Sequence, residues 1–127
     1  FSAGTIGRLT PKPGDGILPA MDTAPPSVCV YCGSSRAAPP AHRDAAAALG
    51  AAIAARGWTL VYGAGRTGLM GALADAALER GGRVVGAIPE SMVEQEVAHD
   101  SLHERFVCRT MHERKAWMAA RADAFVA

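Results

Sequence analysis

The sequence is poor in lysine, in net charge and in long hydrophobic runs. Only two of its 13 basic residues are lysines, Lys12 and Lys115, and the formal net charge is +1. A charge so close to zero argues against a nucleic-acid-binding surface, which needs a clustered excess of basic residues. The apolar runs are broken by Gly, Arg or Asp well short of the roughly 20 residues that span a bilayer. Neither a nucleic acid nor a membrane is therefore expected as a partner.

Cysteine is also scarce, and the three cysteines lack the spacing of a disulfide framework. Cys29 and Cys32 form a C-x-x-C, but they lie in the apolar run 28–32, where residues three apart face opposite sides of a strand. We interpret them as small buried side chains rather than as a redox or zinc pair. No secretory hydrophobic region precedes them, so a cytoplasmic protein is expected. His99 and His103 have the spacing of helical metal ligands, but without an H-E-x-x-H motif no metal site is predicted.

The rest of the sequence predicts one α/β domain after an irregular N-terminal arm. Residues 1–26 are rich in Pro and Gly and lack periodicity, which is typical of a flexible extension. From residue 27 to 127, short β-rich runs alternate with helical segments, which predicts a Rossmann-like parallel sheet with helices on both faces. The expected strands are 28–32, 58–62, 83–88, 105–108 and 124–127, and the expected helices are 41–56, 67–80 and 110–121, with a short one suggested by the capping-box spacing of Ser91 and Glu94.

Two loops that follow predicted strands have compositions suited to a ligand. The segment 33–35 offers an unhindered glycine backbone and two hydroxyls for a phosphate or ribose oxygen, although a plain polar turn has the same composition. The segment 63–68 satisfies G-x-G-x-x-G, a pattern that close packing of a helix on a strand also produces. Ligands of parallel sheets bind where loops leave the carboxyl ends of the strands. The predicted contacts are Gly33, Ser34, Ser35, Gly65 and Gly68.

The second loop also permits a nicotinamide-dinucleotide site. Glu90 lies 22 residues after Gly68 at the end of the next strand, where such a site places the acid that binds the ribose. Against this, the fingerprint usually follows the first strand of the fold, and Pro89 ends the strand before the acid. An NAD-binding domain stays open as an alternative.

The segment 110–115 predicts an anion site at the start of a helix. Thr110 and Glu113 have the spacing of a capping box, in which the hydroxyl accepts from the Glu113 N–H and the carboxylate accepts from the Thr110 N–H. Arg114 and Lys115 then lie at the fourth and fifth helical positions, near the positive end of the helix dipole. A phosphate there would meet two cations, and replacing Arg114 would leave stability nearly unchanged. The alternative is an ordinary solvated helix.

The order of these motifs resembles the LOG ("Lonely guy") family of cytokinin-activating phosphoribohydrolases, often mislabelled as lysine decarboxylases. The resemblance spans residues 27–127 and departs mildly at Ala64, where the family usually has glycine. The shared pieces are C-G-S-S at 32–35, V-Y-G-A-G at 61–65, G-L-M-G at 68–71, I-P-E at 88–90 and M-H-E-R-K at 111–115, with Met118.

The resemblance implies hydrolysis of the N-glycosidic bond of a cytokinin or adenine nucleoside 5′-monophosphate, which releases the free base and ribose 5-phosphate. By position, Arg114 matches the family's catalytic arginine and Lys115 its substrate-binding lysine. Glu96 matches a substrate-contacting glutamate, although by itself it would read as a surface carboxylate in an acidic loop. A homodimer is also implied, and no cofactor is predicted.

One family motif is not found in the sequence. P-G-G-x-G-T-x-x-E, which carries a phosphate loop and a second catalytic carboxylate, would follow directly after Ala127. The resemblance therefore implies the N-terminal part of a Rossmann-like domain, truncated before its C-terminal strands. A non-catalytic nucleotide-binding module is the alternative for a chain without that carboxylate.

Overall fold

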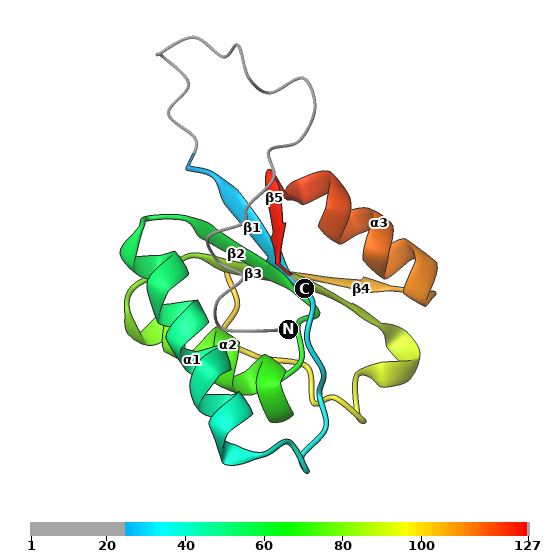
Figure 1. Cartoon of the computed structure of the whole chain (residues 1–127). Coiled ribbons are helices and arrows are strands. Elements are labelled where there is room, and N and C mark those ends of the chain that lie inside the picture. Colours follow the sequence, from blue (N-terminus) through cyan, green and yellow to red (C-terminus); the bar gives the residue numbers. More distant parts are fainter. Residues whose placement is uncertain (1–24, 127) are drawn as a thin grey trace, which may run out of the picture.

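A five-stranded parallel sheet organises the protein, and helices cover both of its faces (Figure 1). The computed structural model describes residues 25–126, so all but the last two residues of the predicted extension 1–26 lie outside the described residues. The strands are β1 (Ser27–Val30), β2 (Thr59–Tyr62), β3 (Val84–Pro89), β4 (Glu104–Cys108) and β5 (Ala124–Val126). The helices are α1 (Pro40–Ala55), α2 (Gly68–Glu79) and α3 (Met111–Arg121), with a 3-10 turn at Glu90–Met92.

The predicted fold class is confirmed, and the predicted strands and long helices end within two residues of their observed limits. A short helical element does lie at Ser91, but the capping box suggested by Ser91 and Glu94 is wrong. That stretch holds only the three-residue 3-10 turn, whose start has no side-chain cap among the described residues. The spacing was misleading because a capping box needs a helix long enough to repay its nucleation.

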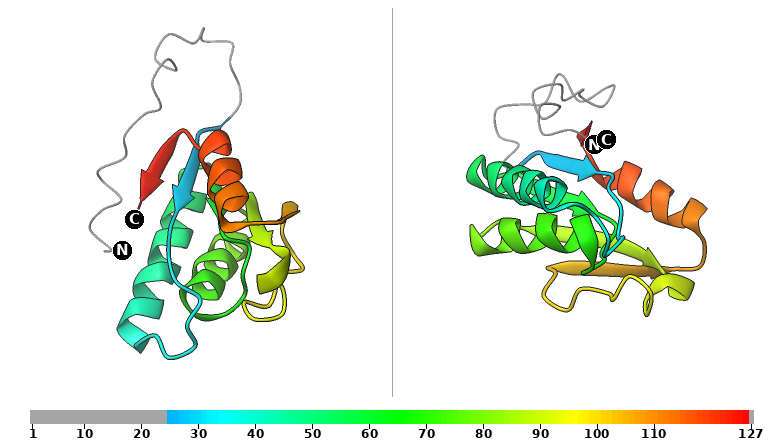
Figure 2. Two further views of the ribbon diagram at one scale, coloured as in Figure 1. Left: turned by 90° about the vertical axis from the view of Figure 1, so that its right-hand side faces the viewer. Right: turned by 60° about the horizontal axis from the view of Figure 1, so that its bottom comes forward.

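Helices α1 and α2 lie on one face of the sheet and α3 lies on the other (Figure 2). The core accordingly has two parts, one on each face. On one face α1 and α2 pack through Leu49 and Leu73 against strand residues such as Leu60. On the other face α3 packs through Met118 against Cys29 and its neighbours. Strands covered on both sides are continuously apolar rather than alternating, which is why β2 and β3 are buried at every position.

The interpretation of a small buried side chain is confirmed for Cys29, whereas Cys32 is half-buried and lies just after β1. Cys29 packs in the cluster under α3, whereas Cys32 packs against the cluster under α1 and α2, so the two side chains face opposite sides of the sheet. Both thiols are free. Burial raises the pKa of Cys29 to about 11 and that of Cys32 to about 12, so neither is a thiolate at neutral pH.

The order of the strands decides where a ligand can bind. The sheet runs β4-β3-β2-β1-β5, so the chain builds outward from β1 in one direction and then returns to place β5 on its other side. Loops diverge at the carboxyl ends of the strands beside such a reversal and leave a crevice there. The loops after β1 and β2 and the start of α3 meet at this end of the sheet. No helix within residues 25–126 is long and apolar enough to cross a membrane.

Candidate active site

The carboxylate of Glu96 joins three segments that are distant in sequence. Oε1 accepts a hydrogen bond from Nη2 of Arg114 at 2.6 Å, and Oε2 accepts one from the hydroxyl of Ser34 at 3.2 Å. Arg114 is 4% exposed and Glu96 is 7% exposed, so this is a buried ion pair. The structure thus brings together three of the predicted site residues. A buried charge pair is tolerated only when hydrogen bonds satisfy the remaining polar atoms.

The guanidinium group of Arg114 supplies those further bonds. Nε donates to the carbonyl oxygen of Ala87 at 2.9 Å, and Nη2 also donates to the carbonyl oxygen of Gly63. Nη1 lies 3.8 Å from the sulfur of Met92 and 3.6 Å from that of Met111. The alternative of an ordinary solvated helix is therefore wrong for Arg114, because the side chain runs inward and binds the carboxyl ends of β2 and β3. A buried, paired arginine also argues against the expectation that its replacement leaves stability nearly unchanged.

The predicted start of α3 is confirmed, and one of the two hydrogen bonds of the predicted capping box is present. The Glu113 N–H donates to the hydroxyl of Thr110 at 3.1 Å. The Glu113 carboxylate does not return to the Thr110 N–H and instead accepts from the N–H of Arg109 at 3.1 Å. The cap still fixes the first turn of α3. It thereby sets the direction in which Arg114 leaves the helix.

An unusual backbone turn explains why Glu96 is buried. The next residue, Val97, has a φ of +51°, a left-handed conformation that a β-branched side chain rarely adopts. Around this turn the carbonyl oxygen of Glu96 accepts from the N–H of Arg66 at 2.9 Å, and Gly65 and Ala98 form an antiparallel bridge. The segment 96–99 therefore pairs with the loop after β2. The alternative of a surface carboxylate is wrong for Glu96.

The predicted loop glycines bring backbones close together. Gly68 has a φ of +59°, and a Cβ there would lie 2.3 Å from the carbonyl oxygen of Ser35. A Cβ at Gly65 would lie 3.3 Å from the Cβ of Glu96. The carbonyl oxygen of Gly33 accepts from the N–H of Met70 at 3.2 Å. Close packing, the alternative interpretation of G-x-G-x-x-G, therefore describes part of what these glycines do.

Two other loop residues depart from the simplest expectation. The hydroxyl of Ser35 accepts from the N–H of Ala37 at 3.1 Å, so Ser35 forms the polar turn while Ser34 alone reaches Glu96. Ala64 adopts a φ of +59°. A left-handed residue at this position accounts for the family's preference for glycine there.

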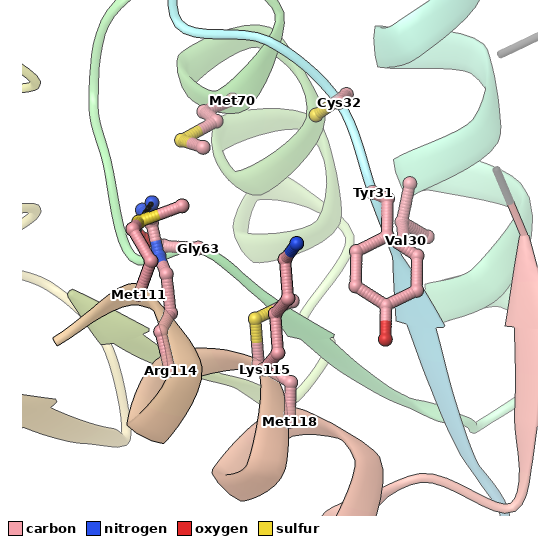
Figure 3. Close-up of a pocket in the computed structure, with 9 residues that line it drawn as sticks. All are labelled: Val30, Tyr31, Cys32, Gly63, Met70, Met111, Arg114, Lys115 and Met118. Carbon is pink, nitrogen blue, oxygen red and sulfur yellow. Dashed lines mark hydrogen bonds between the residues drawn. The ribbon is translucent and has the colours of Figure 1, made fainter.

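A cavity of about 110 Å³ opens beside this network at the carboxyl ends of β1 and β2. Figure 3 shows Lys115 extending from α3 toward the segment that carries Tyr31 and Cys32. Lys115 is exposed, whereas its neighbour Arg114 is buried. The lining residues are Val30, Tyr31, Cys32, Gly63, Met70, Met111, Arg114, Lys115 and Met118. The cavity thus has an exposed cation at its mouth and an apolar wall.

The residues considered for other ligands lie elsewhere. Glu90 is exposed at the start of the 3-10 turn, directly after β3. His99 and His103 do not share a helix, and Nδ1 of His103 accepts from the N–H of Val84. Among the described residues, no group of three or more His, Cys, Asp or Glu side chains could hold a metal ion.

Comparison with known proteins decides the family. Residues 70–127 match a family model described as "Possible lysine decarboxylase". The chain is 45% identical over 121 residues to a cytokinin riboside 5′-monophosphate phosphoribohydrolase of Rhodococcoides fascians, covering 94% of this chain and 61% of that protein. The chain belongs to the LOG family. A probable rice (Oryza sativa subsp. japonica) phosphoribohydrolase, LOGL9, is 49% identical over 100 residues, covering 79% of this chain and 44% of the relative.

This LOG-family chain spans about half the length of the curated relatives it matches. Solved structures support the fold. The molybdenum cofactor carrier protein of Chlamydomonas reinhardtii has a TM-score of 0.65 at 24% identity, over 80% of this chain and 60% of that one. The molybdenum cofactor binding protein of Rippkaea orientalis has a TM-score of 0.66 at 22% identity, over 83% and 65%. At such low identity these likenesses establish a shared Rossmann-like fold alone.

Proposed function

We propose that the protein hydrolyses the N-glycosidic bond of cytokinin or adenine nucleoside 5′-monophosphates. Water attacks C1′ of the ribose, the bond from C1′ to the base nitrogen breaks, and the base leaves with a proton, so the products are free base and ribose 5-phosphate. The observation that carries the proposal is the buried network of Ser34, Glu96 and Arg114 beside the cavity that Lys115 lines. The named activities of the relatives support the reaction class.

Each member of the network has a distinct task in this proposal. Glu96 is a fixed negative group, held at both oxygens, that stabilises the positive charge which develops on the ribosyl ring. Arg114 keeps that carboxylate oriented. Its Nη1 contacts only thioether sulfurs among the described residues, and these are weak acceptors, so this edge of the guanidinium is available to a substrate oxygen. Lys115 binds the 5′-phosphate as a flexible point charge.

The reaction is tested with the full-length protein and AMP. We expect release of adenine and ribose 5-phosphate, and we expect AMP to raise the melting temperature while NAD at equal concentration does little. Glu90→Ala should change neither result. Stronger stabilisation by NAD that is lost in Glu90→Ala would favour a dinucleotide site. Tight binding of AMP without hydrolysis would favour the non-catalytic module.

We further propose a cytoplasmic homodimer. Phe106 and Val107 are 39% and 46% exposed on β4, which is an edge strand of the described sheet. An edge strand with exposed apolar side chains favours association with another chain. We expect light scattering to give the molar mass of two chains, and Phe106→Lys to shift it toward one. A wild-type mass of one chain at micromolar concentration would contradict the dimer.

A further inference from the structure

His99 is a buried histidine that the proposed reaction does not use. Its side chain is 4% exposed, and Nε2 lies 2.7 Å from Oδ1 of Asp75 on α2. Nδ1 accepts a hydrogen bond from the N–H of Ser101 at 3.1 Å. A ring nitrogen that accepts carries no proton, so the ring proton sits on Nε2 and is donated to Asp75. The imidazole of His99 therefore has a defined tautomer, and His99 is the donor of its hydrogen bond to Asp75.

The backbone of His99 is bound as firmly as its side chain. Its N–H donates to the carbonyl oxygen of Ala64 at 2.9 Å, and its carbonyl oxygen accepts from Nη1 of Arg105 at 2.9 Å. His99 thus connects α2, the loop after β2 and the edge strand β4. Glu96 lies three residues earlier in the same segment.

The segment between Glu96 and His99 needs such support. Val97 is held at a φ of +51°, and a strained residue of this kind persists only when its surroundings fix it. On one side of Val97, the N–H of Arg66 binds the carbonyl oxygen of Glu96. On the other side, the side-chain contact of His99 with Asp75 anchors the segment to a packed helix.

Nearby charges do not substitute for this anchor. Asp100 lies 3.7 Å from Arg66 and 3.6 Å from Arg105, but its side chain is 78% exposed. Exposed ion pairs contribute little and cannot fix a backbone turn. Asp75 is also 56% exposed, so what distinguishes its contact is the His99 imidazole, which is 4% exposed. This buried imidazole, together with the backbone hydrogen bonds of Ala98 to Val93 and of His99 to Ala64, therefore holds the segment.

We propose that His99 and Asp75 form a positioning pair that keeps the strained segment 96–99 in place, so that the Glu96 carboxylate stays bonded to Arg114 and Ser34. The role of the pair in turnover rests on the function proposed above. The pair touches no reacting atom and acts through Glu96. Its loss should lower kcat and leave KM nearly unchanged, because Lys115, which binds the phosphate, lies on α3 and is not part of the segment.

Four variants and one control separate this role from general stability. His99→Asn keeps an acceptor near the Ser101 N–H but is too short for Asp75, whereas His99→Gln can present an amide N–H to Asp75. Asp75→Ala removes the acceptor and Asp75→Asn retains one. We expect His99→Asn and Asp75→Ala to lower kcat for AMP hydrolysis by roughly 10- to 100-fold, with KM within about twofold, as a small misplacement of a reacting group would. The conservative variants should recover most of kcat, and Asp100→Ala should match the wild type.

A second readout does not depend on activity. Hydrogen exchange measured by NMR should be faster at the Arg66 and Ala98 amides in His99→Asn and Asp75→Ala than in the wild type, and unchanged in Asp100→Ala. If the wild type does not hydrolyse AMP, the proposed function is refuted. If exchange is nevertheless faster in His99→Asn and Asp75→Ala, the positioning pair is retained. Unchanged exchange would overturn the pair. A wild-type imidazole whose ¹⁵N shifts place the proton on Nδ1 would also overturn it, even if Asp75→Ala does not fold.

Discussion

Replacing Arg114 with alanine should lower the free energy of unfolding by about 3–5 kcal/mol, the usual cost of leaving one partner of a buried ion pair alone. The carboxylate of Glu96 would lose its partner at 2.6 Å, and the carbonyl oxygens of Ala87 and Gly63 would lose their donors. The rate of ribose 5-phosphate release from AMP should fall on the order of a hundredfold or more. Urea unfolding and a single-turnover assay measure the two effects.

The adjacent residue supplies a matched control. Lys115 is exposed, so Lys115→Ala should change stability by no more than about 0.5 kcal/mol. It should weaken AMP binding by about tenfold, the scale of one charge-assisted hydrogen bond. Arg114→Lys should not rescue turnover, because an ammonium group cannot reproduce the planar fork. Equal stability of Arg114→Ala and Lys115→Ala would show that Arg114 is not buried.

A double variant separates stability from chemistry. A buried ion pair can often be replaced by apolar side chains of similar volume without loss of stability. Arg114→Met combined with Glu96→Leu should therefore recover much of the lost stability and none of the turnover. Recovery of turnover in the double variant would mean that neither charge takes part in the reaction.

Features encoded locally could be predicted from the sequence. The strands were found because parallel strands covered on both faces are continuous apolar runs. The helices were found from their periodicity, from the glycine after α1 and from the spacing of Thr110 and Glu113 at the start of α3. The Glu113 carboxylate was expected to accept from the N–H of Thr110 but accepts from that of Arg109, one residue earlier. Several N–H groups are unpaired at a helix start, and they compete for one carboxylate.

The direction of Arg114 was available in the sequence but was missed. Met111, Arg114 and Met118 lie at positions i, i+3 and i+7, which form one stripe of a helix. An arginine between apolar residues on such a stripe is expected to be buried and paired, and the buried residues of α3 are Arg114 and Met118. The proximity of the family pair Arg114 and Lys115 in sequence suggested a shared direction, whereas neighbours on a helix point about 100° apart.

The position of Glu96 could not have been predicted from local signals. It depends on the left-handed turn at Val97 and on pairing of the segment 96–99 with the loop after β2. Neither leaves a pattern in the sequence, because a valine there is unfavourable by itself and the pairing joins residues about thirty positions apart. The contact between His99 and Asp75 is hidden for the same reason.

Replacing Gly68 with alanine should damage the protein far more than replacing Gly81 with alanine. Both glycines have positive φ, +59° and +74°, so both substitutions carry the left-handed cost of roughly 1–2 kcal/mol. A Cβ at Gly68 would also lie 2.3 Å from the carbonyl oxygen of Ser35, whereas a Cβ at Gly81 meets no described atom within 4 Å. The difference between the two variants therefore isolates the close approach of the two loops.

The added loss of stability in Gly68→Ala should be about 1–3 kcal/mol, the usual cost of overpacking, as measured by urea unfolding. The loop can relieve the clash only by moving away from α2, which takes the hydroxyl of Ser34 away from Glu96. Turnover of AMP per folded molecule should therefore fall in Gly68→Ala and stay at the wild-type value in Gly81→Ala. If both variants lose the same stability and the same turnover, then the loops after β1 and β2 are not in contact, and Ser34 is not held against Glu96 by the glycine-rich turn.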